Sequence, residues 1–180
     1  FVGNSIKKAI EAGQFSNLVT FADDSGIEIE KLDNRPGVYS ARYAGEHGND
    51  KANNEKVLAE LKALGLTSSP AKFVSVIALY VPKNVVAGIS KNLLLRYEKY
   101  LTAAGEILLS ARGELAGEIT FNARGENGFG YDPIFEVAGS GLTLAQFSSA
   151  EKSKFSHRAQ ALSNLKNEHQ ALLAEISKLG

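Results

Sequence analysis

The hydrophobic positions of the chain follow two periods, and each period predicts a different kind of element. Residues 72–81 (KFVSVIALYV) form an apolar run that is typical of a buried strand. Residues 18–22 predict another strand, and residues 27–30 predict a third because isoleucine and glutamate alternate there. Further short strands are expected over residues 106–112 and 117–121, as a hairpin or in succession, and over residues 131–137. The chain therefore carries enough strands for a central sheet.

Helical periodicity marks four other segments. Residues 4–12 predict a short helix that ends at Gly13, and residues 50–64 predict a longer one. Residues 155–179 repeat apolar side chains every three or four positions, which predicts an amphipathic helix of about six or seven turns. Residues 83–105 also suit a helix, for which a surface or dimer-contact role is favoured over a ligand site. Strands interleaved with helices indicate an α/β or α+β domain around one sheet.

Composition narrows the function classes. The 180 residues carry 20 basic and 20 acidic side chains, so a surface that coats nucleic acid is not indicated, although a small anion needs only a few cations. The sequence has no cysteine, and its three histidines lie far apart, which argues against disulfides and a zinc site. No signal peptide or long apolar span is evident. We therefore expect a cytoplasmic protein with neither a membrane nor a nucleic acid polymer as partner.

Two adjacent acids interrupt the apolar pattern in FADDSGIEIE, residues 21–30. Asp23 and Asp24 are expected on a loop after a strand, where one carboxylate faces a cleft and the other turns back to the backbone. Mg²⁺ takes carboxylate oxygens, keeps several waters and completes its shell with phosphate, and the same carboxylate can activate a water molecule. The alternative is an Asx-type turn in which both acids bond the amides of Ser25 and Gly26.

A glycine-rich segment, GENGFGYDPIF at residues 125–135, is the second candidate site. Phe129 lies between two glycines, so its ring has little cover and suits stacking on a planar base. Asp132, which is followed by a proline, is placed to accept a hydrogen bond from a ring NH group. The alternative, which composition alone slightly favours, is a tight turn that sends Phe129 and Tyr131 into the core.

A basic segment, AEKSKFSHRAQAL at residues 150–162, opens the last predicted helix and follows a capping-box pattern. Lys152, His157 and Arg158 are therefore expected near a helix N-terminus, where backbone NH groups and the helix dipole favour anions and carbonyl oxygens. The alternative is a solvated basic first turn. Lys8, on the first predicted helix, is likewise either a phosphate contact or a surface residue.

In this order, the three motifs resemble the inosine triphosphate pyrophosphatase family, and the likeness extends from FVGNSIKKA at residues 1–9 to the terminal helix. The resemblance implies an α/β fold in which a mixed central β-sheet is flanked by helices, with a nucleotide cleft between two lobes, usually in a homodimer. It also implies Mg²⁺-dependent hydrolysis of non-canonical purine nucleoside triphosphates (ITP, dITP, XTP) to the monophosphate and pyrophosphate, which removes them from the nucleotide pool.

The resemblance also assigns roles to residues. Asp24 is similar to the metal-linked acid that activates water, with Asp23 as its support. The implied substrate-binding residues are Ser25, Lys8, Phe129, Gly130, Tyr131, Asp132, Lys152, His157 and Arg158. Within this set, Phe129 would stack on the base, while Lys152, His157 and Arg158 would recognise the purine edge. Because Lys and Arg offer only donors, they favour a 6-keto group over the 6-amino group of adenine.

Two departures from the family pattern bear on activity. A chain that begins at Phe1 lacks the family's N-terminal strand and its (S/T)xNxxK phosphate loop, so we expect residues 1–180 to form a single domain without these parts. Gly3 also replaces a glutamate that helps the family bind metal. Two other functions therefore stay open, namely a nucleotide-binding homologue with impaired turnover and a related hydrolase of modified pyrimidine nucleotides.

Overall fold

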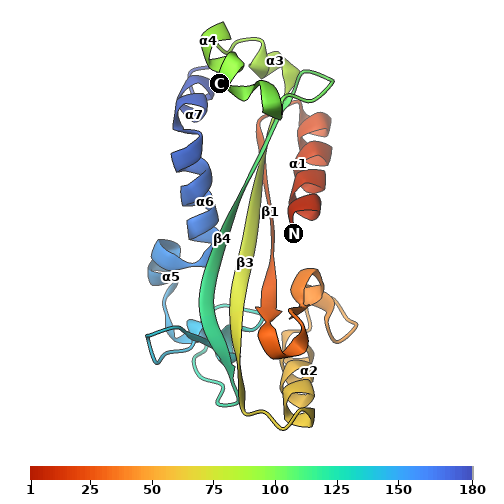
Figure 1. Cartoon of the computed structure of the whole chain (residues 1–180), viewed down its shortest axis with the longest axis vertical. Coiled ribbons are helices and arrows are strands. Elements are labelled where there is room, and N and C mark those ends of the chain that lie inside the picture. Colours follow the sequence, from red (N-terminus) through yellow and green to blue (C-terminus); the bar gives the residue numbers. More distant parts are fainter. Residues whose placement is uncertain (180) are drawn as a thin grey trace. The chain divides into compact units, whose positions relative to one another are not determined.

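The structure is a computed structural model that describes residues 1–179 (Figure 1). The chain forms two compact units. Unit 1 comprises Phe1–Asp24, Val76–Arg112 and the chain from Gln160 on, whereas unit 2 comprises Ser25–Ser75 and Gly113–Ala159. Neither unit is therefore one continuous stretch of sequence.

One five-stranded sheet has the strand order β2-β1-β3-β4-β5. Its strands are β1 (Thr20–Ile29), β2 (Arg35–Pro36), β3 (Ser68–Val81), β4 (Ile107–Thr120) and β5 (Phe135–Val137). β2 pairs antiparallel with β1, with Glu28 opposite Pro36, and β5 pairs antiparallel with β4, with Ile119 opposite Phe135. The expected α/β class, with helices flanking a central sheet, is confirmed, but the sheet is antiparallel, whereas mixed strand directions were expected.

The helices account for most of the remaining ordered backbone in residues 1–179. The α-helices are α1 (Val2–Ser16), α2 (Asp50–Ala63), α3 (Lys83–Val86), α4 (Lys91–Leu94), α5 (Ser149–Phe155), α6 (His157–Glu168) and α7 (Gln170–Ile176). Short 3-10 helices are η1 (Glu30–Leu32), η2 (Gly37–Arg42), η3 (Leu95–Tyr100), η4 (Asp132–Ile134) and η5 (Leu144–Gln146). Across the described residues, no helix combines the length and apolar character that crossing a membrane requires.

Unit 1 packs helices on both faces of its strands. Successive strand residues point to opposite faces, and the core of unit 1 follows this alternation along β3. Ala78 and Tyr80 share a buried cluster with Ala9 of α1. Leu79 and Val81 share a different cluster with side chains of α6 and α7. Helix α1 therefore covers one face of the sheet and α6–α7 cover the other (Figure 1).

Unit 2 closes around Phe73 of β3. Ile27 and Ile29, at alternate positions of β1, are fully buried in the same cluster. Helix α2 contributes Val57 and Leu61, which are fully buried as well. Burying a side chain of this size stabilises a fold by roughly 1.5–3 kcal/mol, so these contacts fix α2 on the strands.

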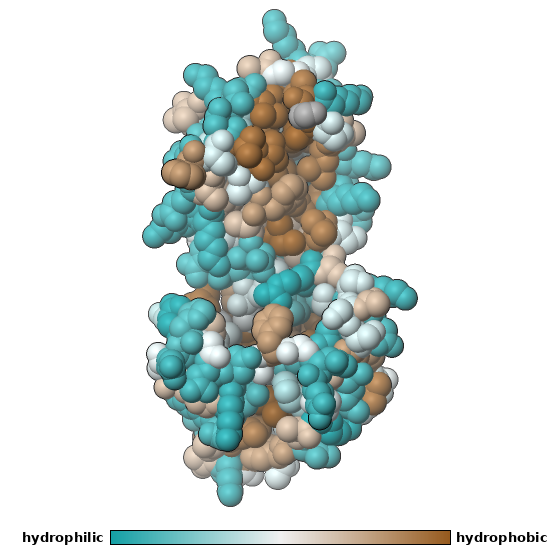
Figure 2. All heavy atoms as spheres, turned by 180° about the vertical axis from the view of Figure 1, so that it is seen from behind, coloured by the Kyte–Doolittle hydropathy of each residue, from teal (hydrophilic) through white to brown (hydrophobic). Residues whose placement is uncertain are grey.

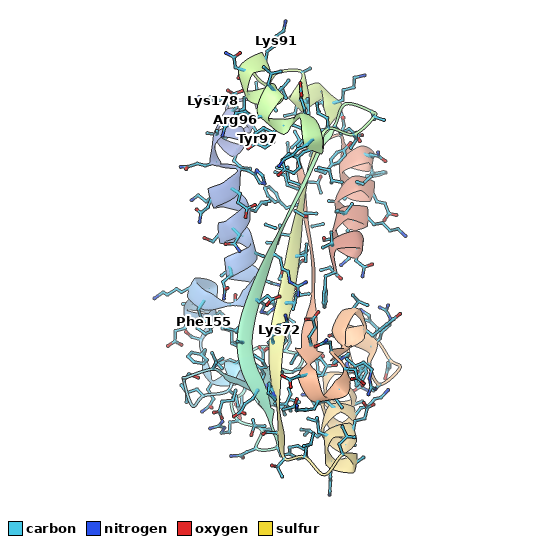
Figure 3. The ribbon with its side chains drawn as sticks, in the orientation of Figure 1. Lys72, Lys91, Arg96, Tyr97, Phe155 and Lys178 are labelled. Atoms are coloured by element: carbon cyan, nitrogen blue, oxygen red, sulfur yellow. The ribbon has the colours of Figure 1, made fainter. Side chains whose placement is uncertain are left out.

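The polar side of the same strands carries a network of charges. Lys72 of β3 donates to the Glu114 carboxylate of β4 at 3.1 and 3.2 Å, and its ammonium lies 3.5 Å from the Glu28 carboxylate of β1 (Figure 3). The three side chains thus join three neighbouring strands. Because the Lys72 and Glu114 side chains are more than a third exposed, this network contributes about 1 kcal/mol or less per pair.

The acid pair lies inside a strand and not on a loop. β1 is unbroken from Thr20 to Ile29, so the strands expected over residues 18–22 and 27–30 are one element. Asp23 is exposed, whereas Asp24 is half-buried and bonded to α1. This difference follows from the opposite directions of successive strand side chains. The expected loop is therefore wrong.

Two other elements are longer than expected. α1 continues past Gly13 and ends at Ser16, and the residue that caps it, Asn17, has a left-handed φ of 55°. Gly13 is a contact point instead of a stop, because a Cβ there would overlap the Tyr80 ring. β4 is a single strand, although residues 106–112 and 117–121 were expected to form two.

The last predicted helix is divided into three. Ser156, with an extended backbone, separates α5 from α6, and His169 separates α6 from α7. The hydrophobic repeat continues across both breaks, so periodicity alone does not reveal them. Residues 83–105 form α3, α4 and η3 and not a single helix.

Large hydrophobic side chains are exposed in unit 1. Phe15 is 95% exposed, and Leu18 and Phe21 are more than half exposed. Figure 2 shows hydrophobic side chains gathered on the surface of this unit. The homodimer that the resemblance implies stays a prediction.

Candidate active site

Unit 2 contains a pocket of about 430 Å³, a volume that suits a small-molecule ligand. The residues that line it are Ser25, Gly26, Ser40, Ala41, Asp50, Phe73, Gly128, Phe129, Gly130, Tyr131, Asp132, Leu144, Ser149, Lys152, Ser156, His157 and Arg158. The candidates from the 125–135 and 150–162 segments therefore meet in one place, together with Ser25 of β1.

Phe129 presents its ring at the pocket. The residue is 65% exposed, so the alternative that places this side chain in the core is wrong. The Arg158 guanidinium lies 5.5 Å from the ring centroid, in a cation–π arrangement. The flanking Gly128 and Gly130 have φ values of 95° and 63°, which glycine adopts without strain. A Cβ at Gly128 would also overlap the Lys152 side chain.

Lys152 and Asp132 form a largely buried ion pair on the pocket wall. The Lys152 Nζ donates to Asp132 Oδ2 at 2.8 Å and to the Asn127 carbonyl at 3.2 Å. Burial raises the pKa of the Asp132 carboxyl above its usual value, and the Lys152 ammonium opposes this rise. A lysine carries three donors and a carboxylate two acceptor oxygens, so the pair presents a donor beside an acceptor.

Tyr131 anchors the glycine-rich segment to the core. Its hydroxyl donates to the Ser40 carbonyl at 2.8 Å, and burial raises the pKa of this phenol. The Ser40 hydroxyl in turn accepts from the Ile27 amide at 2.9 Å and donates to the Gly37 carbonyl at 2.6 Å. Helix η2 is thereby tied both to β1 and to the glycine-rich segment.

His157 begins α6 and is only 6% exposed. Its ring stacks on the Phe73 ring with centroids 4.9 Å apart and an interplanar angle of 11°. A buried ring that is stacked in this way has a fixed orientation, so the edge that it offers to the pocket is set before a ligand arrives.

Helix α5 places Lys152 at the pocket. The expected capping box is present, because Ser148 and Glu151 bond each other's backbone NH groups at the start of α5. At the other end of the helix, the Phe155 ring (Figure 3) packs edge-on against the Phe147 ring, with ring centroids 5.0 Å apart. The helix is therefore held at both ends, and Lys152 projects from a fixed backbone.

The acid pair belongs to a second group of polar residues, in unit 1. Asp24 Oδ1 accepts from Lys8 Nζ at 3.1 Å, and Oδ2 accepts from Asn4 Nδ2 at 3.1 Å. Lys8 also donates to the Asp23 carbonyl at 3.0 Å. Lys8 is therefore an ion-pair partner of Asp24 in this structure.

The oxygen ligands near Asp24 are compatible with a hard cation that takes few of its ligands from the protein. Within residues 1–179, no three His, Asp or Glu side chains gather in a metal-binding group. Mg²⁺ is often bound through one or two carboxylates, with water and substrate phosphates in the other positions. Asp24 supplies one ligand of this kind, whereas the Asp23 side chain points to the opposite face of β1, so Asp24 alone of the pair fits a cation that the substrate helps to bind.

Several residues around these groups were not singled out from the sequence. Asn4 bonds Asp24, Ser40 holds Tyr131, and Asp50 and Asn54 of α2 contact the glycine-rich segment. Asn4 and Lys8 are four residues apart on α1, so they share a helix face. That spacing was visible in the sequence, but its partner strand was not.

The chain is similar to proteins of one family along most of its length. The model of the Ham1 family matches residues 1–168. The dITP/XTP pyrophosphatase of Haemophilus influenzae is 44% identical over 167 residues, which cover 93% of this chain and 75% of the relative. The dITP/XTP pyrophosphatase of Bacillus subtilis is 42% identical over 165 residues, which cover 92% of this chain and 72% of that protein.

Solved structures give the same result. A HAM1 protein from Coxiella burnetii has a TM-score of 0.77 at 37% identity, covering 95% of this chain and 77% of that chain. The Staphylococcus aureus Ham1 protein has a TM-score of 0.73 at 37% identity, covering 97% of this chain and 76% of that chain. The likeness inferred from the three sequence motifs is thus confirmed, and the chain belongs to the Ham1 family.

Proposed function

We propose that this protein hydrolyses non-canonical purine nucleoside triphosphates, namely ITP, dITP and XTP, to the monophosphate and pyrophosphate. The observation that carries the proposal is the Lys152–Asp132 pair beside Phe129 in a pocket of suitable size. Relatives that bear the name dITP/XTP pyrophosphatase support it.

The pair matches the edge of a 6-keto purine. Hypoxanthine and xanthine present the O6 acceptor next to the N1–H donor. Lys152 supplies a donor for O6, and Asp132 supplies an acceptor for N1–H. Adenine presents the reverse pattern, a 6-amino donor beside an N1 acceptor, so the same pair would leave buried polar groups unpaired. This mismatch provides discrimination against ATP.

Phe129 and Arg158 supply the base-stacking surface. A planar base stacks on an exposed aromatic ring, and each such contact is worth about 1–3 kcal/mol. The Arg158 guanidinium already lies over the Phe129 ring, so it restricts the directions from which a base can approach. Ser25 and His157 complete the wall with polar side chains that suit the nucleoside.

Asp24 is the proposed catalytic acid–base residue. A water molecule attacks the α-phosphorus, the bond between the α-phosphorus and the bridging oxygen breaks, and pyrophosphate leaves. Asp24 orients this water and accepts its proton, while Lys8 and Asn4 hold the carboxylate in position. Mg²⁺, held by Asp24, would stabilise the developing charge on the phosphate oxygens.

The test is pyrophosphate release from ITP, dITP, XTP, ATP and GTP, measured with and without Mg²⁺ on this chain. Fast, metal-dependent release from the first three supports the proposal. Binding of ITP without release would instead indicate a homologue with impaired turnover, and preference for modified pyrimidine triphosphates would indicate the related hydrolase. The cytoplasmic location and the homodimer stay predictions.

A further inference from the structure

Two side chains of α2 hold Gly130 at both of its backbone polar atoms. Asp50 Oδ2 accepts a hydrogen bond from the Gly130 NH at 2.6 Å. The Asn54 side-chain amide donates to the Gly130 carbonyl at 3.1 Å. Asp50 and Asn54 are four residues apart, so they project from the same face of the helix. One helix face thus clamps a single residue of the glycine-rich segment.

Gly130 needs such a support. Its φ of 63° is left-handed, a conformation that glycine enters easily and also leaves easily. A Cβ at this position would meet no atom within 4 Å, so no neighbouring atom packs against the side of the residue where a side chain would lie. The hydrogen bonds from α2 therefore hold the Gly130 backbone, next to the anchor that buried Tyr131 provides.

Phe129 depends on this backbone because its own side chain is weakly held. The residue is 65% exposed, and its ring is contacted by the Arg158 guanidinium at 5.5 Å, which is a modest interaction. Residues on both sides of it are glycines. The direction of the ring is thus set by the peptide groups that flank it.

We propose that Asp50 and Asn54 are positioning residues that hold the Phe129 ring in its base-stacking direction by clamping Gly130. This inference rests on the proposed function, in which Phe129 stacks on the purine. Neither side chain needs to touch the reacting atoms. Both act through the backbone of the residue that follows the stacking ring.

The Asn54 side chain supports a role beyond helix formation. Its amide oxygen is buried without a hydrogen-bond partner among residues 1–179. Such a group lowers stability, and an apolar residue would avoid the loss. The N-terminus of α2 is capped by another residue, because the Asn49 side chain accepts a hydrogen bond from the Ala52 amide at 3.1 Å. The bond to Gly130 is what the Asn54 amide adds.

The chain contains no tryptophan, so Phe129→Trp introduces a single fluorescent reporter at the stacking position. In this background, Asp50→Ala and Asn54→Leu each remove one half of the clamp. Lys51→Ala and Glu55→Ala are the matched controls, since these exposed residues of α2 form an ion pair with each other, with Nζ and Oε1 3.9 Å apart. Asp50→Asn keeps an acceptor oxygen for the Gly130 NH, so this variant should behave much more like the parent protein than Asp50→Ala does.

Two readouts are expected to change together. Without nucleotide, the tryptophan anisotropy should fall in the clamp variants because the ring gains freedom. In the clamp variants, half-maximal quenching of the tryptophan should require about tenfold more ITP. The loss of one hydrogen bond changes a dissociation constant by about that factor. In the Phe129 background, KM for ITP should rise by a similar factor while kcat changes less. The Lys51 and Glu55 variants should match their parents.

The possible failures separate two conclusions. Anisotropy and ITP affinity that are unchanged in both clamp variants would overturn the positioning role. Two negative results together would overturn the proposed function instead: the Phe129→Trp protein does not respond to ITP, and the protein with its native Phe129 does not release pyrophosphate. The anisotropy without nucleotide still tests the clamp in that case. If Asp50→Ala does not fold by circular dichroism, Asn54→Leu, which keeps the branched side-chain shape, carries the same test.

Discussion

Gly13 lies so close to the Tyr80 ring that no side chain fits at position 13. A Cβ built there would overlap three atoms of the ring, whereas a Cβ at Gly3, on the same helix, would meet nothing within 4 Å. Tyr80 itself is fixed, because it is 2% exposed and its hydroxyl donates to Glu106 at 2.7 Å. Of the two glycines of α1, Gly3 therefore has room for a side chain, whereas Gly13 does not.

Gly13→Ala is expected to destabilise the protein by about 1–3 kcal/mol, because overpacking outweighs the better helix propensity of alanine. Gly3→Ala should be neutral or raise the free energy of unfolding by about 0.5 kcal/mol. Urea denaturation of both variants measures the difference. Equal stability of the two would show that the Tyr80 ring moves aside without loss.

Asp24→Asn should lower the rate of pyrophosphate release from ITP by about 10²–10⁴-fold, because the amide cannot accept a proton from water. Nucleotide binding should be largely intact, as measured by equilibrium dialysis with ITP. Glu11→Gln is the control, since it makes the same acid-to-amide change at an exposed position of the same unit. A fully active Asp24→Asn protein would remove this residue from catalysis.

Lys152→Met should cost roughly 3 kcal/mol at neutral pH, because Asp132 is left buried without its cation. The pKa of Asp132 is already raised by burial, so this carboxyl favours the folded state only while protonated, and its ionisation opposes folding as the pH rises. Removing the ammonium raises that pKa further. The difference in unfolding free energy from wild type should therefore shrink as the pH falls toward the ordinary Asp value of 3.8.

Thermal unfolding of wild type and Lys152→Met between pH 4 and pH 8 checks this expectation. The pair Asp132→Asn and Asp132→Asn/Lys152→Met serves as the control, because neither protein has this carboxyl to titrate and the difference between the two should not depend on pH. A constant difference for Lys152→Met alone would mean that the ion pair does not control the ionisation of Asp132. The ITP preference over ATP should fall in the same variant.

The protein should lose stability as the pH rises from 10 toward 12. Burial and a hydrogen bond to a glutamate raise the pKa of Tyr43 and of Tyr80 to about 12. Both phenols therefore favour the folded state while protonated, an effect that is complete below their ordinary value of 10.0 and is lost as the pH passes through 12. Tyr43→Phe and Tyr80→Phe should each flatten this decline in a pH series of thermal unfolding. Parallel curves for all three proteins would contradict the assignment.

The sequence predicted those parts of the fold that depend on local pattern. The apolar run at 72–81 lies within β3, and the helix expected over residues 50–64 is α2. In both cases the period of buried side chains and the end signals agree. The α5 capping box was found for the same reason, since its two members are three residues apart.

The parts that the sequence did not predict depend on distant partners. Asp23, Asp24 and Ser25 have the composition of a turn, yet they continue a strand, because Lys8 and Asn4 of α1 satisfy Asp24. A window of sequence contains no information about that helix. The same holds for the candidate site, where the pocket residues of the 125–135 and 150–162 segments were identified but the clamp from α2 was not.

The division of the chain between the two units has a consequence for cleavage. The sequence changes unit after Asp24, Ser75, Arg112 and Ala159. After a single proteolytic cut at any one of these junctions, the chain would still connect the two units at the other three. Nicked protein should therefore migrate as two fragments under denaturing conditions but as one species in native gel filtration, and neither half can be expressed alone as an uninterrupted gene segment.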